Sequence, residues 1–291
     1  MTERVPLRLH EDTAFFREAV SFTSAQTGFA ARLIEKDYFC SVLLQDLAAT
    51  APDLIFRGGT CLAKVHMGFY RLSEDLDFLV STPVESTRTQ RSRRAAEPKA
   101  AVATIEKRLA GLHVVTPFTG ANDSSQYIGV IGYRSLLAER EETIRIEIGL
   151  REPLLTRAIG GEAKTLVLDP VSRLPVVPVF PVPCLSREEA MADKLRAALS
   201  RRDAAIRDFY DVDHAVRLLG FRLHDSSLVE LIRQKLGVPG NEPVDISANR
   251  LAALKLQLES QLKPVLRDQD FADFDLDRAF AIVAETAVAL G

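Results

Sequence analysis

The sequence predicts an α+β protein, a mixed sheet flanked by helices and followed by a C-terminal helical bundle. Three observations lead to this fold class. Apolar residues recur at helical spacing through residues 13–49, β-like segments follow as far as residue 150, and the patterns after a proline-rich stretch are almost wholly helical. We therefore expect an α/β domain with N-terminal helices at residues 1–180 and a helical domain at residues 181–291.

The elements of the first domain follow from periodicity and turn residues. Two helical runs occupy residues 13–49, and the polar, basic stretch at residues 81–99 is expected to be a loop. A helix is expected at residues 60–69 and another at residues 101–110. Strands are expected at residues 53–57, 75–80, 113–118, 127–133 and 143–150.

The second domain follows a proline-rich connector at residues 174–186. Ser186 and Glu189 have the spacing of a capping box that opens a helix at residues 186–200, and this helix carries Lys194. Further helices are expected at residues 209–219, 227–235, 248–262 and 276–290.

Composition excludes several classes of protein. With 47% hydrophobic and 26% charged residues, the chain can bury a core, and global disorder is not expected. A net charge of -3 argues against a generally basic nucleic-acid coat but allows a local basic patch. Cys40, Cys61 and Cys184 are far apart and form no CxxC pair, which argues against a disulfide scaffold or a zinc cage and fits a reducing compartment. The charged N-terminus and the lack of a long apolar run predict a cytoplasmic protein that does not enter a membrane.

Two aspartates in the expected strand at residues 75–80 form the main candidate site. Side chains two residues apart on a strand point the same way, so Asp75 and Asp77 present two carboxylates to one side. Such like charges repel unless a cation lies between them, and Mg²⁺ is the natural ion for carboxylates and substrate phosphates. The same letters recur at Asp275 and Asp277, where no glycine turn precedes them, and that copy is interpreted as a solvated helix start.

A glycine turn before the aspartates indicates a phosphate site. Gly58 and Gly59 permit a tight turn and the close approach of a ligand to the backbone. Thr60 then opens a helix whose free N–H groups suit a phosphate. The segment lacks the second glycine and the Lys-Ser/Thr ending of a Walker loop, which excludes that motif.

These segments resemble the nucleotidyltransferase family of the AbiEii/AbiGii toxins, a branch of the DNA polymerase β-like superfamily. That superfamily has a Gly-Gly or Gly-Ser turn, then D-x-D, then a third acid on a later strand. The resemblance extends from about residue 35 to residue 215. Its segments are E-K-D-Y-F at residues 35–39, F-R-G-G-T-C-L-A-K at 56–64, R-L-S-E-D-L-D-F at 71–78, A-D-K-L-R-A-A-L-S-R-R at 192–202 and R-D-F-Y-D at 207–211.

The resemblance implies a polymerase β-like nucleotidyltransferase fold and a role for each matching residue. Gly58, Gly59 and Thr60 would hold the nucleotide phosphates, and Asp75 and Asp77 would bind the metal, Mg²⁺ or alternatively Mn²⁺. The remaining implied roles are Glu147 as the third acid and base for the incoming hydroxyl, Lys194 as a triphosphate contact, and Asp211 as the functional acid of the later motif.

The residues themselves leave alternatives open. Glu147 shares a strand face with Arg145 and could form a plain surface ion pair. Lys194 lies on a largely apolar stripe and so needs an anion, although most lysines on such a helix are solvated. Asp211 could instead form an i,i+4 pair with Arg207 one helical turn away, or belong to a structural lock that joins the two halves.

Three further features have no assigned chemistry. Ser73 could orient a carboxylate or a phosphate, or be an ordinary turn serine. Residues 35–38 are interpreted as packing of the N-terminal helices under the sheet. His66 and His214 lack metal-ligand spacing and are interpreted as structural.

The resemblance also implies the partners: an NTP, a tRNA or other RNA acceptor, and a cognate antitoxin protein. The basic residues at 88–99, with Arg201 and Arg202, could clamp a phosphate backbone, or they could be a disordered surface. Two alternative functions are a nucleotidyltransferase for a small molecule or a protein hydroxyl, and a non-catalytic nucleotide-binding module.

Overall fold

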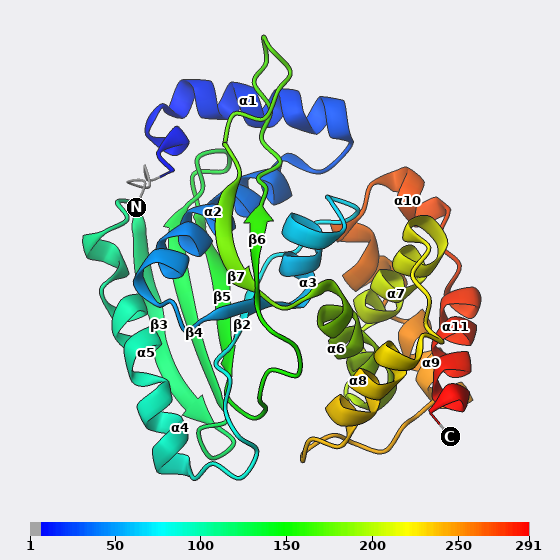
Figure 1. Ribbon diagram of the computed structural model, residues 1–291. Helices are drawn as coiled ribbons and strands as arrows, with labels where there is room; N and C mark the ends of the chain where they lie inside the picture. The colour runs from blue at the N-terminus through cyan, green and yellow to red at the C-terminus, as the bar shows by residue number, and fades with distance from the viewer. Residues whose placement is uncertain (1–6, 291) are drawn as a thin grey trace. The chain divides into compact units, whose positions relative to one another are not determined.

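The computed structural model describes residues 7–290. The chain divides into two compact units, one formed by Met1–Leu154 with Ala158–Leu185 and the other by Leu155–Arg157 with Ser186–Gly291. Figure 1 traces the chain through both units. Within the part of the chain that is described, no helix has the length and apolar character needed to cross a membrane.

A seven-stranded mixed sheet forms the centre of the first unit, in the order β3-β4-β5-β2-β1-β7-β6 (Figure 1). β2 is antiparallel to β1 and parallel to β5, and β1 is parallel to β7. This sheet and its flanking helices confirm the predicted α+β class. The strands are β1 Ile55–Arg57, β2 Leu76–Leu79, β3 Leu112–Ala121, β4 Gln126–Arg134, β5 Glu141–Gly149, β6 Ile159–Ala163 and β7 Phe180–Cys184.

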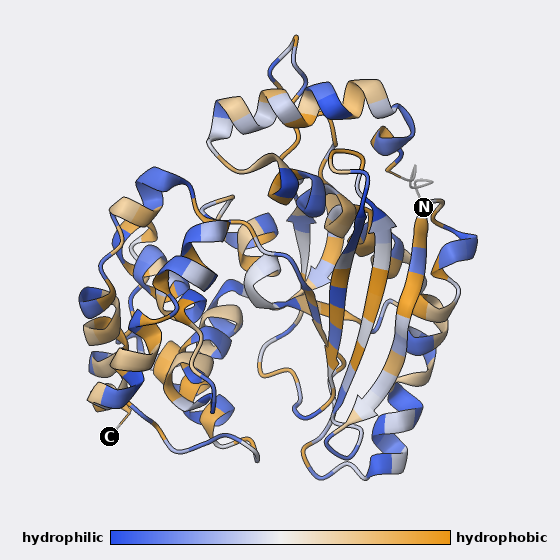
Figure 2. Cartoon of the chain, turned by 180° about the vertical axis from the view of Figure 1, so that it is seen from behind, coloured by the Kyte–Doolittle hydropathy of each residue, from blue (hydrophilic) through white to orange (hydrophobic). Residues whose placement is uncertain are grey.

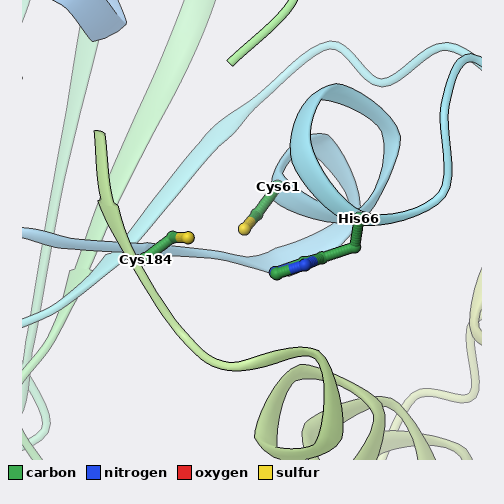
Figure 3. A group of neighbouring side chains, drawn as sticks. All are labelled: Cys61, His66 and Cys184. Atoms are coloured by element: carbon green, nitrogen blue, oxygen red, sulfur yellow. The ribbon is translucent and has the colours of Figure 1, made fainter. Parts of the chain in front are cut away.

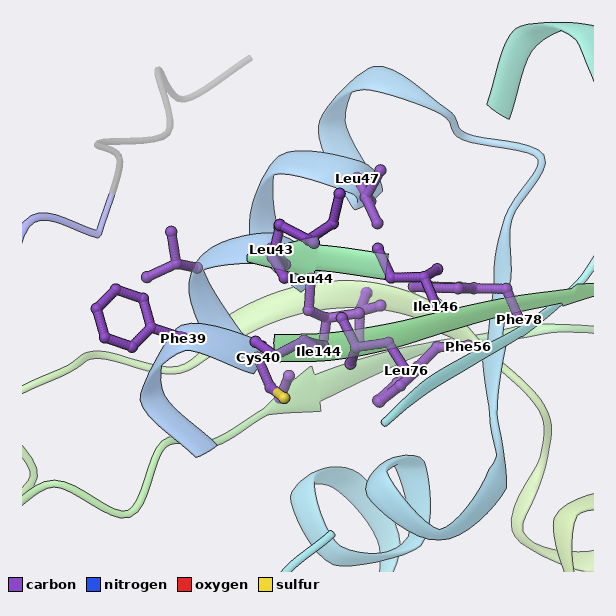
Figure 4. Packing of buried hydrophobic residues seen from close by; sticks show 14 of the residues in the cluster. Phe39, Cys40, Leu43, Leu44, Leu47, Phe56, Leu76, Phe78, Ile144 and Ile146 are labelled. Atoms are coloured by element: carbon purple, nitrogen blue, oxygen red, sulfur yellow. The ribbon is translucent and has the colours of Figure 1, made fainter. Parts of the chain in front are cut away.

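Helix α2 (Ala31–Thr50) covers one face of this sheet, and α1 (Thr13–Thr27) packs on α2. Figure 4 shows leucines of α2 against apolar residues of β1, β2 and β5. Each such side chain contributes roughly 1.5–3 kcal/mol when it is fully buried. Because strand residues alternate in direction, burying Leu76, Phe78 and Ile146 on this face turns Asp77 and Glu147 to the opposite face.

The interpretation of residues 174–186 as a connector is wrong, because residues 180–184 form β7 between β1 and β6. Prolines are rare inside a sheet because they lack an N–H donor. Here Phe180, Val182 and Cys184 are buried, whereas the two prolines occupy the alternating, less buried positions. The pairing with β1 is confined to Phe56 and Cys184, so few donors are needed on that side. The glycine-containing strand β6 was not predicted.

The expected loop at residues 81–99 is also wrong, because most of it is helical. Helix α4 (Arg88–Arg94) begins with a capping box between Thr87 and Gln90, and α5 (Ala96–Ala103) follows directly. The helix expected at residues 101–110 therefore begins earlier and ends earlier, with a 3₁₀ turn at Ile105–Lys107 after it. The Thr87–Gln90 spacing was a helix signal that the surrounding polar residues obscured.

The second unit consists of helices. Figure 2 shows that these helices carry both hydrophobic and hydrophilic residues. Ser186 caps α6 as expected, but the Glu189 carboxylate accepts hydrogen bonds from the Leu155 and Thr156 N–H groups instead of closing a capping box. Asp275 caps α11, which confirms the interpretation of the second D-L-D as a helix start. The helices are α6 Arg187–Ser200, α7 Ile206–Leu219, α8 Ser226–Leu236, α9 Ala248–Lys255, α10 Asp268–Ala272 and α11 Leu276–Ala289.

Candidate active site

A row of charged residues crosses three neighbouring strands of the sheet. Asp77 of β2 is the register partner of Glu147 on the parallel strand β5. On its other side, Asp77 is the register partner of Arg57 on the antiparallel strand β1. Register partners point to the same face of a sheet, so the two carboxylates and the guanidinium project from one face. Arg57 also forms an ion pair of 3.1 Å with the buried Glu152.

The glycine turn lies against this row. Gly58 has a φ of +76°, which disfavours any side chain, and a Cβ at this position would collide with the Asp77 carboxylate. A Cβ on Gly59 would collide with the guanidinium of Arg71, which is buried. Gly58 is therefore required by its backbone conformation and by Asp77, whereas a side chain at position 59 would displace the Arg71 guanidinium.

Helix α3 (Gly58–Cys61) begins at the turn itself, two residues earlier than expected, and continues as a π-helical turn at Leu62–His66. Thr60 lies in this helix and is buried, and its hydroxyl donates a hydrogen bond to the Asp75 carbonyl. Asp75 itself precedes β2, which begins at Leu76, so only Asp77 lies within the strand. Ser73, Asp75 and Asp77 are all half-buried.

Glu147 is held from two sides. The amide of Gln126 on β4 donates to its Oε1 at 2.6 Å, and the Arg145 guanidinium donates to Oε2. The expected ion pair with Arg145 therefore forms, and it coexists with the pairing to Asp77. Gln126 was not predicted from sequence. Gln126 lies on the adjacent strand, two residues from Ile128, which is the register partner of Glu147. This register of the β4–β5 hairpin cannot be obtained from sequence spacing alone.

Residues 35–38 of α2 make specific polar contacts rather than the plain packing expected of them. Lys36 and Arg32 each donate to Glu74, next to Asp75, at 3.0 Å. Burial alone would raise the pKa of the Glu74 carboxyl, but the two cations and their hydrogen bonds outweigh burial and lower it below its usual value. The segment that carries the aspartates is thereby fixed to α2.

Asp37, the next residue of α2, forms a buried ion pair with Lys64 at 2.6 Å. Lys64 lies in the π-helical turn behind the glycines and also donates to the Ser41 hydroxyl at 2.7 Å. Glu35 accepts hydrogen bonds from the Ser135 hydroxyl and the Leu136 N–H, between β4 and β5. The Tyr38 hydroxyl contacts His10, and burial raises the pKa of Tyr38 to about 12. Helix α2 therefore anchors the turn behind the glycines and, at other points, the β4–β5 loop and the segment at His10.

Lys194 and Asp211 belong to the second unit, where they contact each other. The Lys194 ammonium lies 2.8 Å from Asp211 and 2.7 Å from Asp208, and all three side chains are largely buried. The buried Lys194 ammonium therefore has its anionic partners within this unit, in the carboxylates of Asp208 and Asp211. Asp208 was not predicted, although Asp208 and Asp211 have the i,i+3 spacing of one helix face.

The first unit accordingly brings together Gly58, Gly59, Thr60, Asp77 and Glu147. Asp75 adjoins them through the Thr60 hydrogen bond. The carboxylate oxygens of Asp75 and Asp77 are of the kind that suits a hard divalent cation such as Mg²⁺. A sheet face that presents carboxylates beside a glycine turn can hold a metal and the phosphates of a nucleotide.

Two solved structures share the fold of this chain. The MenT4 nucleotidyltransferase toxin of Mycobacterium tuberculosis has a TM-score of 0.57 at 17% identity, covering 94% of this chain and 98% of that protein. JHP933 from Helicobacter pylori has a TM-score of 0.52 at 15% identity, covering 90% and 93%. No curated protein is significantly similar to the chain in sequence.

The sequence also matches a family model over residues 42–284, which include the glycine turn, the three acids and the second unit through most of α11. The description of that family is nucleotidyl transferase AbiEii toxin, type IV toxin–antitoxin system. Enzymes with this activity use divalent metal ions. The match spans well over half of the chain, and the chain belongs to the AbiEii nucleotidyl transferase toxin family.

Proposed function

We propose that this nucleotidyltransferase toxin transfers an NMP from an NTP to RNA, with tRNA as the first acceptor to test and Mg²⁺ as the metal. Membership of the family implies a nucleotide substrate and an antitoxin partner. The observation that carries the proposal is the register pairing of Asp77 with Glu147 beside the glycine turn. An NTP and tRNA as substrates would have the toxin act in the cytoplasm.

In the proposed site, the N–H groups of Gly58, Gly59 and Thr60 bind nucleotide phosphates, because the first turn of a helix has N–H groups without intrahelical partners. Asp75 and Asp77 hold the metal through their carboxylates. Thr60 fixes the backbone at Asp75, and Ser73 contributes a hydroxyl to the segment that leads into the acids. When bound, Mg²⁺ supplies charge neutralisation to the phosphates.

The reaction is a phosphoryl displacement. The acceptor hydroxyl oxygen forms a bond to the α-phosphorus of the NTP, the bond from that phosphorus to the bridging oxygen breaks, and pyrophosphate leaves. Glu147 accepts the proton of the attacking hydroxyl. Gln126 and Arg145 hold its carboxylate in place on the sheet face.

For the two residues of the second unit, the proposed roles are a triphosphate contact for Lys194 and a functional acid for Asp211. Asp208 and Asp211 flank the Lys194 ammonium, so they fix its position. In the absence of a nucleotide, the same contacts stabilise α6 against α7.

The preference for RNA is supported by the charge of α4. Arg88 and Arg93 are exposed, and among residues 7–290 neither guanidinium has a hydrogen bond or ion pair. Arg91 and Arg94 donate to backbone carbonyls of Val84 and Ser81, which holds this short helix in place. Exposed arginines on an ordered helix favour a phosphate backbone as acceptor.

The test is incubation of the purified protein with each α-labelled NTP, Mg²⁺ and total RNA, with Asp75→Ala as the comparison. Label on tRNA that is absent with Asp75→Ala is the expected result. Label on protein or on a small molecule would instead support the alternative acceptors. No transfer with any NTP, and no difference between the two proteins in nucleotide binding, would leave only a non-catalytic module.

A further inference from the structure

Three side chains with metal-ligating atoms, none of them part of the carboxylate row, meet in the first unit. Cys61 is the last residue of α3, His66 is the last residue of the π-helical turn, and Cys184 is the last residue of β7. Their two sulfurs and one ring nitrogen all lie within 4.8 Å of one another. Figure 3 shows the two thiols facing each other with the imidazole beside them.

The topology explains why residues so distant in sequence meet. Phe56 of β1 is the register partner of Cys184, and the chain runs from β1 through the glycine turn directly into α3. The Leu185 N–H also donates to the Phe56 carbonyl, which fixes the end of β7 at this point. Cys61 and Cys184 therefore meet, contrary to what the spacing of the cysteines indicated, and His66 is not isolated from them.

His66 has the environment of a histidine ligand. Its Nε2 lies 3.0 Å from the Leu185 carbonyl, which can only accept, so Nε2 carries the proton. In the neutral imidazole, which is the form that binds a metal, the lone pair is then on the other ring nitrogen. Metal-bound histidines characteristically donate their second N–H to a carbonyl or carboxylate in this way, which fixes the tautomer and the ring orientation.

The two thiols are chemically unequal. Both cysteine residues are fully buried. A hydrogen bond from Cys61 lowers the pKa of Cys184, whereas burial and Cys184 raise the pKa of Cys61. A thiolate is the form that binds metals. The third cysteine, Cys40, is equally buried but has no place in the cluster, and burial raises its pKa to about 12.

We propose that Cys61, His66 and Cys184 bind a Zn²⁺ ion that is distinct from the divalent ion of the nucleotidyltransferase site. Two cysteines and one histidine form a known three-ligand zinc set, with the fourth position taken by water or another small ligand. Zn–S bonds of about 2.3 Å and Zn–N bonds of about 2.0–2.1 Å put tetrahedral ligand atoms about 3.8 Å apart or less. The sulfurs and the nitrogen need only small side-chain adjustments to reach that spacing.

Such an ion would tie the helix of the glycine turn to the end of β7. Soft thiolates select Zn²⁺ over Mg²⁺, whereas the carboxylates of the candidate active site have the opposite preference. The two sites can therefore be loaded and tested independently.

The test is titration of the reduced, metal-free full chain with Co²⁺, which reports thiolate ligation through a sulfur-to-metal charge-transfer absorption. One equivalent of Co²⁺ should produce the charge-transfer band. Zn²⁺ should displace the Co²⁺ ion, abolish the band and raise the melting temperature of the protein. Cys61→Ser and Cys184→Ser should lose the band. Cys40→Ser removes an equally buried thiol and should retain it, as should Asp77→Asn, which alters only the carboxylate site.

The wild-type chain is decisive even if a cysteine variant fails to fold. Absence of a thiolate band at saturating Co²⁺, or a band that survives in both Cys61→Ser and Cys184→Ser, would overturn the proposal. A Cys61–Cys184 disulfide in protein purified under reducing conditions would also overturn it, since the pair would then be a redox couple.

Discussion

Asp77 of β2 and Glu147 of β5 are partners in a parallel strand pair, although seventy residues separate them in sequence. The pairing joins the acid that follows the glycine turn to the acid that the family resemblance selects as the third. On its other side β5 pairs with β4, which puts Glu147 within reach of Gln126, and Arg145 lies two residues away on β5; these two side chains bind the Glu147 oxygens.

Replacing Glu147 by Gln should lower the rate of nucleotide transfer by about 10²–10⁴-fold, the usual contribution of a general base. Glu141→Gln is the matched control, because Glu141 lies on the same strand and the same face but is exposed at the strand end. The measurement is the initial rate of label transfer at saturating NTP. Equal rates for the two variants would reduce Glu147 to an ion-pair partner of Arg145.

Gly58→Ala should abolish transfer, because the new methyl group would collide with the Asp77 carboxylate. Gly111→Ala is the control that introduces backbone strain without a collision. Gly111 also has a positive φ, +83°, but nothing lies within 4 Å of its Cβ position. Both variants should lose about 1 kcal/mol or more of stability in urea unfolding, since alanine disfavours a positive φ. Retained transfer in Gly58→Ala would contradict the proposed position of the nucleotide.

Asp37→Asn should lower the free energy of unfolding by about 3–5 kcal/mol, because it leaves the Lys64 ammonium buried without its countercharge. Glu139→Gln removes the carboxylate of an exposed pair with Arg17 and should cost less than about 1 kcal/mol. Urea unfolding of the two variants measures the difference. A similar small loss for both would show that the Lys64 ammonium does not depend on Asp37.

Glu74 should make stability depend on acid pH. Its pKa in the folded chain is lowered from the usual 4.5, so its contribution is fully present above that value and is lost as the pH falls through the folded pKa. Glu74→Gln should therefore be less stable than the wild type at neutral pH. The difference in stability between the two proteins should decrease below pH 4.5. Melting temperatures across this range test the point, with Glu85→Gln as an exposed control. A stability difference that does not change with pH would show that Glu74→Gln is destabilised by altered packing and not by the lost charge.

The fold class was predictable because helices and strands differ in apolar period, and the alternation of β5 is regular. The failures have local causes. Strand β7 has prolines at its less buried positions, so its composition resembles a connector. Helix α4 is short and exposed and contains several arginines, so apolar periodicity could not reveal it.

For the candidate site, sequence spacing was informative where the chain is continuous, from the glycine turn to Asp77. It was uninformative where the contact depends on register or helix packing. Lys36 meets Glu74, and Lys194 meets Asp208, only through tertiary packing. The two cysteines and His66 meet because β7 lies beside β1, and that neighbour relationship depends on a strand that was not predicted.

The most direct test of the nucleotidyltransferase site uses the two D-L-D segments of the chain. Asp77→Asn changes the acid beside the glycine turn, and Asp277→Asn makes the same change in the exposed first turn of α11. The measurement is label transfer from NTP to RNA by each variant, with folding checked by circular dichroism. We predict at least a roughly hundredfold loss for Asp77→Asn and wild-type transfer for Asp277→Asn. Equal transfer by both folded variants would contradict the proposed site.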